Sequence, residues 1–262
     1  MIRIRKIKRP IALLTDFGLK DHYVGSLKAV ILKINPKAVI FDVTHDVTPQ
    51  NIREGAFVLA ALYPVLPKNF IVVAVVDPGV GSARQAICVK TDKGYLIGPN
   101  NGLLGLALRD VKHYEVRAIE NDRFFHKPVS STFHGRDIFS PSAAWLSKKN
   151  VFHAFGPRLK DIHKIHIPSL LRKKDSIQGE IIYIDRFGNA FTNITKNVFP
   201  FKSFAIFVKK HRVKLKPFFS AGNTKELIAV WNSTDSLEFA VKENSAEKLF
   251  GLKVGDPVLI QK

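Results

Sequence analysis

Carboxylates stand directly after three apolar segments of the chain. Asp16 follows the first segment, Asp46 the second and Asp77 the third. A carboxylate in such a place can accept two hydrogen bonds from a ribose diol, as acidic side chains do in many nucleoside sites. The alternative is a turn or helix-capping role, which is the better interpretation of Asp46. For Asp16 a ligand role is favoured, because Gly18 and Gly25 would let a ligand approach the backbone.

The third carboxylate belongs to the segment FIVVAVVDPGVGSAR, residues 70–84. The apolar, mostly β-branched residues that open this segment predict a strand buried on both faces. Ligands of open α/β sheets lie just beyond the carboxyl ends of such strands, so Asp77 and Arg84 are candidate catalytic residues. Asp-Pro-Gly is also a common turn sequence. This segment alone fits either interpretation.

Three further segments are unusually polar for their surroundings, at residues 132–137, 185–189 and 232–235. The first packs a histidine, an arginine and an aspartate together before a predicted helix. It could equally be a capped helix start, with Asp137 favourable at the positive end of the helix dipole. The second could be a plain hairpin turn and the third a loop between strands. Each segment by itself is a weak indication of function.

Several common catalytic and binding motifs are absent from the sequence. No GxGxxG follows the first predicted strand and no GxxxxGK[ST] occurs, which argues against dinucleotide and P-loop sites. The nine histidines form neither HExxH nor a Cys/His cluster, so no metal ligands are predicted. The GxSxG motif of serine hydrolases is absent too. Metal-free chemistry on a nucleoside is the class that remains.

The candidate residues lie at the ends of elements that alternate in type. Strands and helices are predicted in turn, at residues 11–14, 23–34, 38–43, 51–62 and 70–76. This order predicts a Rossmann-like α/β domain, with a mostly parallel sheet and helices on its faces. A hairpin, a short helix, a strand and a longer helix are expected to follow, at residues 86–97, 103–108, 114–118 and around 144–146.

The pattern changes after about residue 160. Residues 161–176 lose the helical period and contain a charge run, which predicts a linker between an N-terminal domain, 1–160, and a C-terminal domain, 177–262. Short apolar or alternating segments follow without long helices between them, which is typical of a small β-barrel. They lie at residues 179–184, 205–208, 227–230, 237–241 and 258–260.

The net charge of +19 invites a nucleic-acid interpretation. The basic residues are spread along the chain, with local clusters at 3–9, 172–174 and 209–216, and no recognition motif accompanies them. No specific nucleic-acid partner is therefore predicted. A single methionine and few glutamines are instead typical of adaptation to heat, with a solvated lysine-rich surface.

Cysteine use and hydropathy indicate the compartment. The one cysteine, Cys88, excludes an intrachain disulfide and suits a reducing cell interior. The apolar run at residues 70–76 is far too short for a membrane span, and the basic start lacks the apolar region of a secretory signal. We expect a cytoplasmic protein without a membrane partner.

Five motifs occur in order along the chain: LTDFG (14–18), DPGVG (77–81), GPNNG (98–102), TFHGRD (132–137) and DRFGN (185–189). Together they resemble the S-adenosyl-L-methionine (SAM) hydroxide adenosyltransferases, water-using relatives of the fluorinase and chlorinase. The resemblance covers nearly the whole chain after Pro10. It implies an N-terminal α/β domain, a C-terminal β-barrel, and a homotrimer with each site between one subunit's first domain and its neighbour's second.

The same resemblance implies the reaction. SAM, the substrate, is hydrolysed to adenosine and L-methionine by attack of an activated water or hydroxide at the ribose C5′, with no cofactor and no metal. Asp16 is similar to the aspartate that holds the ribose hydroxyls. Asp77, Arg84 and His134 match the set that handles the water.

The proton acceptor stays open at this point. His134, with an ordinary pKa of about 6.5, could accept the proton near neutral pH. A neighbouring arginine lowers the pKa of a carboxyl by about 1–3 units, so Asp77 is favoured as an orienting group paired with Arg84.

The resemblance also implies substrate contacts from the C-terminal domain. Asp185 and Asn189 match residues around the methionine and adenine portions of SAM. The sulfonium would favour nearby carboxylates such as Asp185, which could also bind the methionine ammonium. Asn193, Ser233 and Glu238 are further candidates nearby.

Two other functions fit parts of the sequence. Halogenating members of the fold carry an aromatic residue in place of Asp77, and the fluorinase has an insertion where residues 91–94 turn directly into the next strand. A carboxylate would repel a halide, so both departures favour water. A non-catalytic SAM- or adenosine-binding protein would need Asp16 and Asn189. It would gain nothing from the set of Asp77, Arg84 and His134.

Overall fold

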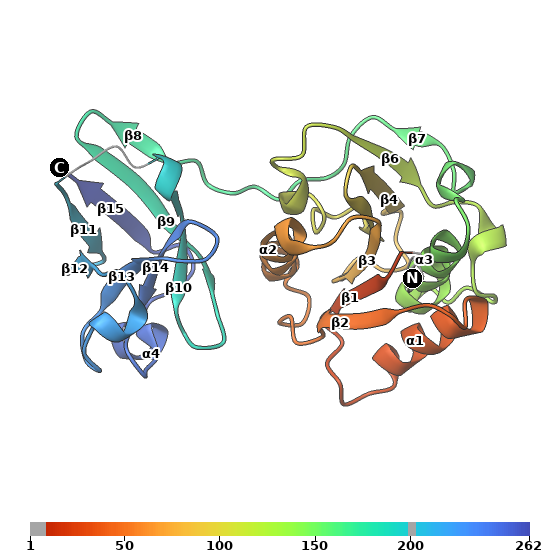
Figure 1. Ribbon diagram of the computed structural model, residues 1–262, viewed down its shortest axis with the longest axis horizontal. Coiled ribbons are helices and arrows are strands. Elements are labelled where there is room, and N and C mark those ends of the chain that lie inside the picture. Colours follow the sequence, from red (N-terminus) through yellow and green to blue (C-terminus); the bar gives the residue numbers. More distant parts are fainter. Residues whose placement is uncertain (1–8, 199–202) are drawn as a thin grey trace, which may run out of the picture. The chain divides into compact units, whose positions relative to one another are not determined.

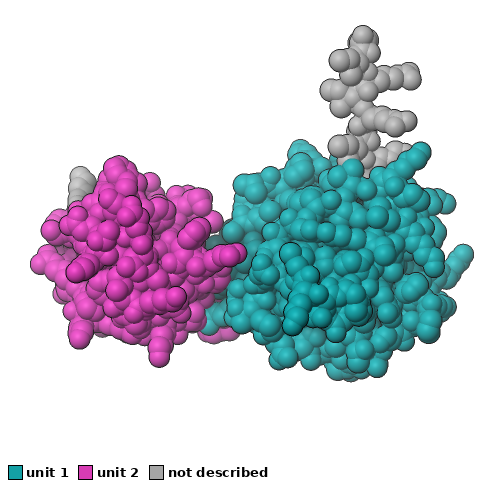
Figure 2. All heavy atoms as spheres, turned by 90° about the horizontal axis from the view of Figure 1, so that it is seen from below, with its two compact units in different colours: residues 1–165 teal, residues 166–262 magenta. Residues whose placement is uncertain are grey.

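The chain divides into two compact units, residues 1–165 and 166–262, which Figure 2 draws in different colours. The computed structural model describes residues 9–198 and 203–262. Of the basic cluster at residues 3–9, only Arg9 lies inside the described residues. Its guanidinium donates to the Leu146 carbonyl at 2.7 Å and so ties the start of the first strand to a helix.

The first unit is built on a seven-stranded sheet with the order β2-β1-β3-β5-β4-β6-β7 (Figure 1). Its strands are β1 (Ile11–Thr15), β2 (Ile40–Thr44), β3 (Phe70–Val75), β4 (Ala86–Thr91), β5 (Gly94–Pro99), β6 (Tyr114–Ala118) and β7 (Arg158–Leu159). β2, β1, β3 and β5 run parallel, whereas β4, β6 and β7 join in antiparallel pairs. The predicted α/β fold is confirmed. The sheet is mixed rather than mostly parallel, because the hairpin β4–β5 reverses the chain.

Three helices cover the two faces of this sheet: α1 (Tyr23–Ile34), α2 (Ile52–Leu62) and α3 (Ser140–Lys148). Successive residues of β1 alternate between two cores. Ile11 and Leu13 belong to the core that contains residues of α1 and α3. Ala12 and Leu14 belong to the core that contains residues of α2. Burying one leucine or isoleucine side chain contributes about 1.5–3 kcal/mol, so helices on both faces hold the sheet in place.

Helices α1 and α2 lie where the sequence predicts them. The buried residues of α1 recur at helical spacing: Val24, Leu27, Val30 and Ile31. Asn51 caps α2 by accepting the Glu54 N–H at 3.1 Å, and the Glu54 carboxylate accepts from Asn51 Nδ2 at 3.2 Å. This reciprocal arrangement resembles a capping box. α2 ends two residues before Pro64, which has no N–H to continue it.

The first three strands are parallel, so their carboxyl ends lie at one edge of the sheet. The chain leaves β1 through α1 to β2 on one side, then crosses through α2 to β3 on the other side of β1. Because α1 and α2 belong to different cores on opposite faces, the segments that follow β1 and β2 leave the sheet on opposite sides. Thr15 pairs with Val75 in the parallel ladder. Asp16 and Asp77, which follow these strands, therefore emerge at the same edge of the sheet.

Two segments of the first unit differ from the sequence-based expectation. The helix predicted at residues 103–108 is wrong, since only a 3₁₀ turn, Leu106–Leu108, forms there. A π-helical turn, Gly135–Phe139, precedes α3, in a segment for which the sequence predicted a loop or a capped helix start. Such turns are rare and often occur at functional sites.

The second unit is a β-barrel. Seven strands pair in the order β10-β14-β13-β12-β11-β15-β9, and a further pairing of β10 with β9 closes the ring. β8 is an additional strand that pairs with β9. The strands are β8 (Leu171–Lys173), β9 (Ser176–Ile184), β10 (Ala190–Thr195), β11 (Ala205–Val208), β12 (His211–Leu215), β13 (Ile228–Trp231), β14 (Ser236–Ala240) and β15 (Pro257–Gln261). One short helix, α4 (Ala246–Phe250), precedes β15. The barrel core contains the buried residues Ile181, Ile194, Phe239 and Leu252.

The predicted barrel is confirmed, although three of its strands were not predicted. β10 and β12 were missed, and β8 lies inside the predicted linker, residues 161–176. In β12 only the central Val213 is fully buried, so its sequence HRVKL resembles a solvated segment. Across both described stretches, 9–198 and 203–262, no helix combines the length and apolar character needed to cross a bilayer.

Candidate active site

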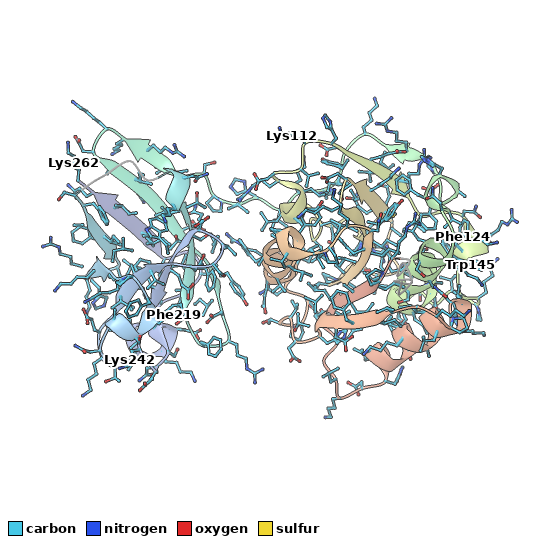
Figure 3. All side chains as sticks on the ribbon, viewed as in Figure 1. Lys112, Phe124, Trp145, Phe219, Lys242 and Lys262 are labelled. Carbon is cyan, nitrogen blue, oxygen red and sulfur yellow. The ribbon has the colours of Figure 1, made fainter. Side chains whose placement is uncertain are left out.

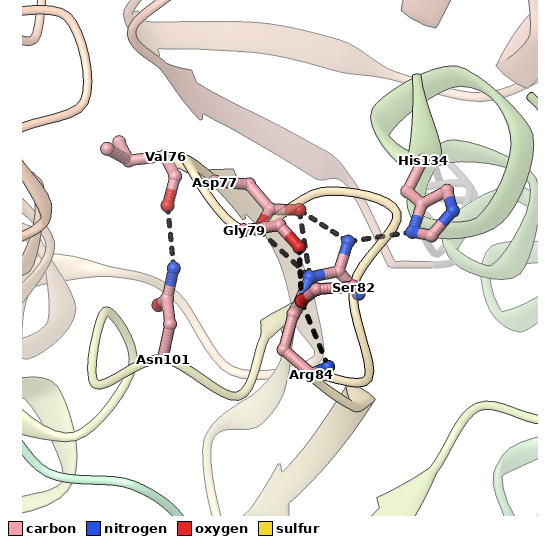
Figure 4. Close-up of polar contacts among 7 residues, drawn as sticks. All are labelled: Val76, Asp77, Gly79, Ser82, Arg84, Asn101 and His134. Carbon is pink, nitrogen blue, oxygen red and sulfur yellow. Dashed lines mark hydrogen bonds and ion pairs between the residues drawn. The ribbon is translucent and has the colours of Figure 1, made fainter. Parts of the chain in front are cut away.

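Asp77 and Arg84 face each other just beyond β3 (Figure 4). Arg84 Nε lies 2.9 Å from Asp77 Oδ1 and 3.0 Å from Oδ2, and Arg84 Nη2 also donates to Oδ2. Both side chains are largely buried, with 5% of Asp77 and 10% of Arg84 exposed. Two-pronged pairing of this kind fixes the direction of both groups. The carboxylate keeps further lone pairs that can accept hydrogen from a ligand.

His134 joins this pair through Arg84. Arg84 Nη2 lies 2.7 Å from His134 Nδ1. A guanidinium can only donate, so Nδ1 is the acceptor and its lone pair is occupied. The imidazole in this arrangement is neutral and carries its hydrogen on Nε2.

The electrostatic surroundings agree with a neutral imidazole. Burial lowers the pKa of His134 below its usual value of 6.5, and the adjacent Arg84 cation lowers it further. The carboxylates of Asp77 and Asp137 oppose this change only in part. His134 is therefore uncharged at neutral pH.

The loop after β3 is held by short contacts. Ser82 Oγ donates to the Gly79 carbonyl at 2.7 Å and accepts the Arg84 N–H at 3.3 Å. Gly81 has φ +79°, and a Cβ there would lie 2.3 Å from the Ser131 carbonyl oxygen. Only glycine lets this loop pack against the segment that leads into the π-helical turn.

Two further side chains fix the backbone on either side of the site. Asn101 Nδ2 donates to the Val76 carbonyl at 2.9 Å, which holds the end of β3 (Figure 4). Asp137, fully buried in the π-helical turn, accepts the Ser130 N–H at 2.8 Å and Arg136 Nε at 2.7 Å. Asp137 therefore supports the π-helical turn that directly follows His134.

Asp16 lies at the end of the neighbouring strand. Its Oδ2 accepts the Gln50 N–H at 2.7 Å, and Gln50 adopts a left-handed backbone with φ +66°. Burial raises the pKa of Asp16 and the charge of Asp77 raises it further, whereas the backbone hydrogen bonds oppose this change.

Asp185 and Asn189 form the two ends of a tight turn between β9 and β10 in the second unit. Asp185 Oδ1 accepts the N–H groups of Phe187 at 2.9 Å and Asn189 at 2.8 Å. Gly188 has φ +78°, and a Cβ there would lie 2.0 Å from Ser245 Oγ. The turn therefore requires glycine where it packs against the start of α4.

Glu238, on β14, is the most strongly perturbed acid of the second unit. It is 2% exposed, and burial raises its pKa to about 7. The charge of Asp185 adds to this rise, whereas the nearby amide side chains of Asn232 and Asn189 oppose it. Glu238, Asp185 and Asn189 thus form one polar group, and Ser233 lies exposed in the loop before β14.

Asn193 is held inside the barrel wall. Its Oδ1 accepts the Glu180 N–H at 2.9 Å and its Nδ2 donates to the Pro168 carbonyl at 2.8 Å. Both ends of this amide are thus committed to the protein itself. A contribution of Asn193 to substrate binding would be indirect.

Two family models match the chain. The SAM hydroxide adenosyltransferase N-terminal domain matches residues 11–156, and the corresponding C-terminal domain matches residues 179–259. The chain belongs to the SAM hydroxide adenosyltransferase family. The assignment drawn from the five ordered motifs is thereby confirmed.

Individual relatives of this SAM hydroxide adenosyltransferase are similar over most of their length. A Thermus thermophilus protein named (R)-S-adenosyl-L-methionine hydrolase is 36% identical over 257 residues, covering 95% of this chain and 98% of that protein. A solved structure described as an uncharacterized conserved protein from Thermotoga maritima has a TM-score of 0.87 at 36% identity, covering 95% of this chain and 99% of that one. A fluorinase of Nocardia brasiliensis is more distant, 25% identical over 216 residues, covering 71% of this chain and 72% of that protein.

Hydrogen bonds join Asp77, Arg84 and His134, and Asp16 directly follows the adjacent strand β1. Gln50, which holds the Asp16 carboxylate, was not predicted. It acts through a backbone N–H that any residue except proline supplies, so its side-chain type carries no signal. Within the parts of the chain that the structure describes, no group of three or more His, Cys, Asp and Glu side chains is placed to hold a metal ion.

Proposed function

We propose that this SAM hydroxide adenosyltransferase hydrolyses SAM to adenosine and L-methionine by attack of water at the ribose C5′. The observation that carries this proposal is the buried pair of Asp77 and Arg84, beside Asp16 at the strand ends. A relative 36% identical over nearly its whole length is named a SAM hydrolase. That name specifies the R configuration at sulfur, and we extend the same preference to this chain.

The reaction balances with water as the only co-substrate. The water oxygen forms a bond to C5′, the C5′–S bond breaks, and its electron pair returns to sulfur. The sulfonium becomes the neutral thioether of methionine, and one proton is released. Because a sulfonium is a good leaving group, the main task of the site is to place the water in line. Positioning of this kind contributes about 7–11 kcal/mol.

The site supports a division of roles among three residues. Asp77 accepts a hydrogen bond from the water and aims it, while Arg84 fixes the Asp77 carboxylate and His134 fixes Arg84. The water becomes strongly acidic as its oxygen bonds to C5′, so its proton can leave late without a strong base. His134 is disfavoured as the proton acceptor, because its Nδ1 lone pair is already used.

Substrate contacts are proposed in both units. Asp16 accepts the ribose hydroxyls. In the second unit Asp185 binds the methionine ammonium and Asn189 binds the adenine. Ser233 and Glu238 are further candidates for substrate contacts near them. The polar group around Glu238 supports this assignment, since it gathers hydrogen-bonding side chains at one end of the barrel strands.

Halide chemistry is the second function considered. The Asp77 carboxylate would repel a halide at the position where the water is proposed to lie. The fluorinase is also a more distant relative than the SAM hydrolase. Both observations favour water as the nucleophile.

A product assay tests the proposal. Purified protein is incubated with the separated R and S epimers of SAM, with and without chloride, and the products are chromatographed. We expect adenosine and methionine in equal amounts, faster from the R epimer and at a rate indifferent to chloride. Asp77→Ala should abolish most turnover, whereas Asp110→Ala, which changes an acid whose side chain is 88% exposed, should not. Formation of 5′-chloro-5′-deoxyadenosine, or binding of SAM without turnover, would overturn the proposal.

We further propose a homotrimer that works in the cytoplasm without a metal. Light scattering of the purified protein should give three chain masses. Turnover should survive prolonged treatment with a chelator. A monomeric mass would contradict the trimer. Activity that is lost on chelation and returns only on addition of a divalent cation would contradict the proposed metal independence.

A further inference from the structure

A line of polar side chains runs from α1 to the strand end that carries Asp16. Lys28 Nζ lies 2.6 Å from Asp42 Oδ2. Asp42 Oδ1 lies 3.1 Å from His45 Nε2, and His45 Nδ1 lies 2.8 Å from Thr15 Oγ1. Thr15 and His45 are buried, with 0% and 4% exposed, whereas the outer pair is partly solvated.

Donors and acceptors along this line can be assigned. Although burial opposes the change, Lys28 and His45 lower the pKa of Asp42, which is therefore ionised at neutral pH. His45 Nε2 faces this carboxylate at 3.1 Å but outside hydrogen-bond geometry, and we place the ring hydrogen on this nitrogen because it is the one next to the anion. In the neutral imidazole with its hydrogen on Nε2, Nδ1 is an acceptor and the Thr15 hydroxyl donates to it. The Thr15 oxygen in turn accepts the Phe17 N–H at 3.2 Å.

His45 holds the chain on both sides of Asp16. Its side chain binds Thr15, the residue before Asp16. Its backbone carbonyl accepts the Gly18 N–H at 2.8 Å, two residues after Asp16. The Gln50 N–H meanwhile holds the carboxylate itself. Residues 15–18 are thus fixed from the interior and from the start of α2.

We propose that His45 is a positioning residue for Asp16. By fixing residues 15–18 it keeps the Asp16 carboxylate ready for the ribose diol, so that less ordering is required when the nucleoside binds. His45 acts through Thr15 and does not touch the substrate. The inference rests on the proposed function, because it takes Asp16 to be the group that binds ribose.

Ribose discrimination is the ratio of the Kd for 2′-deoxyadenosine to the Kd for adenosine, measured by calorimetry on the full chain. A merely structural role of His45 would leave this ratio unchanged. Thr15→Val removes the hydroxyl with little change in volume and should lower this ratio about fivefold to tenfold, by weakening adenosine alone. Thr15→Ser should restore the ratio. His113→Gln, at an exposed position, is the matched control for the histidine change and should leave it unchanged.

Two further variants keep the test decisive if Thr15→Val does not fold. His45→Gln and Asp42→Asn should lower the same ratio. If these variants weaken both nucleosides equally, or lower only the melting temperature, the positioning role is wrong.

Asp16→Ala reports on the proposed function separately. If Asp16→Ala keeps the wild-type ratio, or the wild type does not discriminate, the ribose role of Asp16 fails and the inference fails with it. If Asp16→Ala abolishes the ratio while the Thr15 and His45 variants keep it, only the positioning role fails.

Discussion

His134 Nδ1 and Arg84 Nη2 lie 2.7 Å apart, which makes the histidine a hydrogen-bond acceptor in this site. Arg84 also pairs with Asp77, so the three residues form a line with the arginine at its centre. The carboxylate end of this line is the part that can meet a hydrogen of the attacking water. His134 contributes by fixing Arg84.

Replacement of His134 separates this role from proton transfer. The Oδ1 of asparagine can take the place of Nδ1 as an acceptor for Arg84, whereas alanine offers none. We expect His134→Ala to lower kcat about 100-fold and His134→Asn to stay within about tenfold of the wild type, with SAM affinity preserved in both. Product chromatography gives kcat and calorimetry gives Kd. Equal losses of kcat in the two variants would instead indicate that the imidazole itself takes the proton.

Replacement of Asp77 should lower turnover, whereas replacement of Asp16 should lower the affinity for SAM. Asp77→Ala removes the group that we propose aims the water, so kcat should fall about 10²- to 10⁴-fold while SAM still binds. Asp16→Ala removes the acceptor that we propose for the ribose diol, so the Kd for SAM should rise about 10- to 100-fold. The same rate and calorimetric measurements apply. An equal loss of affinity in both variants would show that the two roles are misassigned.

The pH dependence of adenosine binding reports on Asp16. Its carboxylate accepts hydroxyl hydrogens only when ionised, and burial raises its pKa, so protonation begins at a higher pH than for an ordinary aspartate. Adenosine affinity should therefore fall as the pH drops from 7 towards 4 (about one decade of Kd per unit below the pKa). Asp16→Asn should bind weakly and without this dependence. Calorimetry at several pH values measures it, and a wild-type affinity that stays constant across the range would contradict the role.

Glu238 should make the folded protein less stable as the pH rises from 4.5 to 7. Its pKa is raised from 4.5 to about 7 in the folded state, so the folded chain keeps a proton that the unfolded chain releases. Below pH 4.5 both states are protonated and there is no effect. Between pH 4.5 and 7 stability falls, and above pH 7 the full cost remains, on the order of 3 kcal/mol. Thermal unfolding of Glu238→Gln should show a higher melting temperature than the wild type at pH 8 and little difference at pH 4.5. Glu247→Gln, at an exposed position, is the control. An unchanged pH slope in Glu238→Gln would refute this cost.

The sequence was most informative where strand ends carry unusual residues. The apolar run of β3 and the polar residues after it predicted both the strand and the candidate pair of Asp77 and Arg84. The helices α1 and α2 were predictable because their apolar spacing, caps and prolines agree. The five motifs predicted the family.

Long-range contacts account for what the sequence did not predict. The hydrogen bond between Arg84 and His134 joins residues 50 positions apart, so no local pattern indicates that the histidine is an acceptor. The role of His45 was not predicted, because its contact with Thr15 exists only once β1 and β2 are paired. β12 was missed because one face of this barrel strand is solvated and carries charged side chains. Its local hydropathy is therefore that of a loop.

The most direct test of the central claim is hydrolysis of SAM in ¹⁸O-enriched water, followed by mass spectrometry of both products. Attack of water at C5′ predicts one labelled oxygen in adenosine, on the ribose fragment, and none in methionine. Adenosine without label, label in homoserine instead, or a 5′-halogenated nucleoside would contradict the claim.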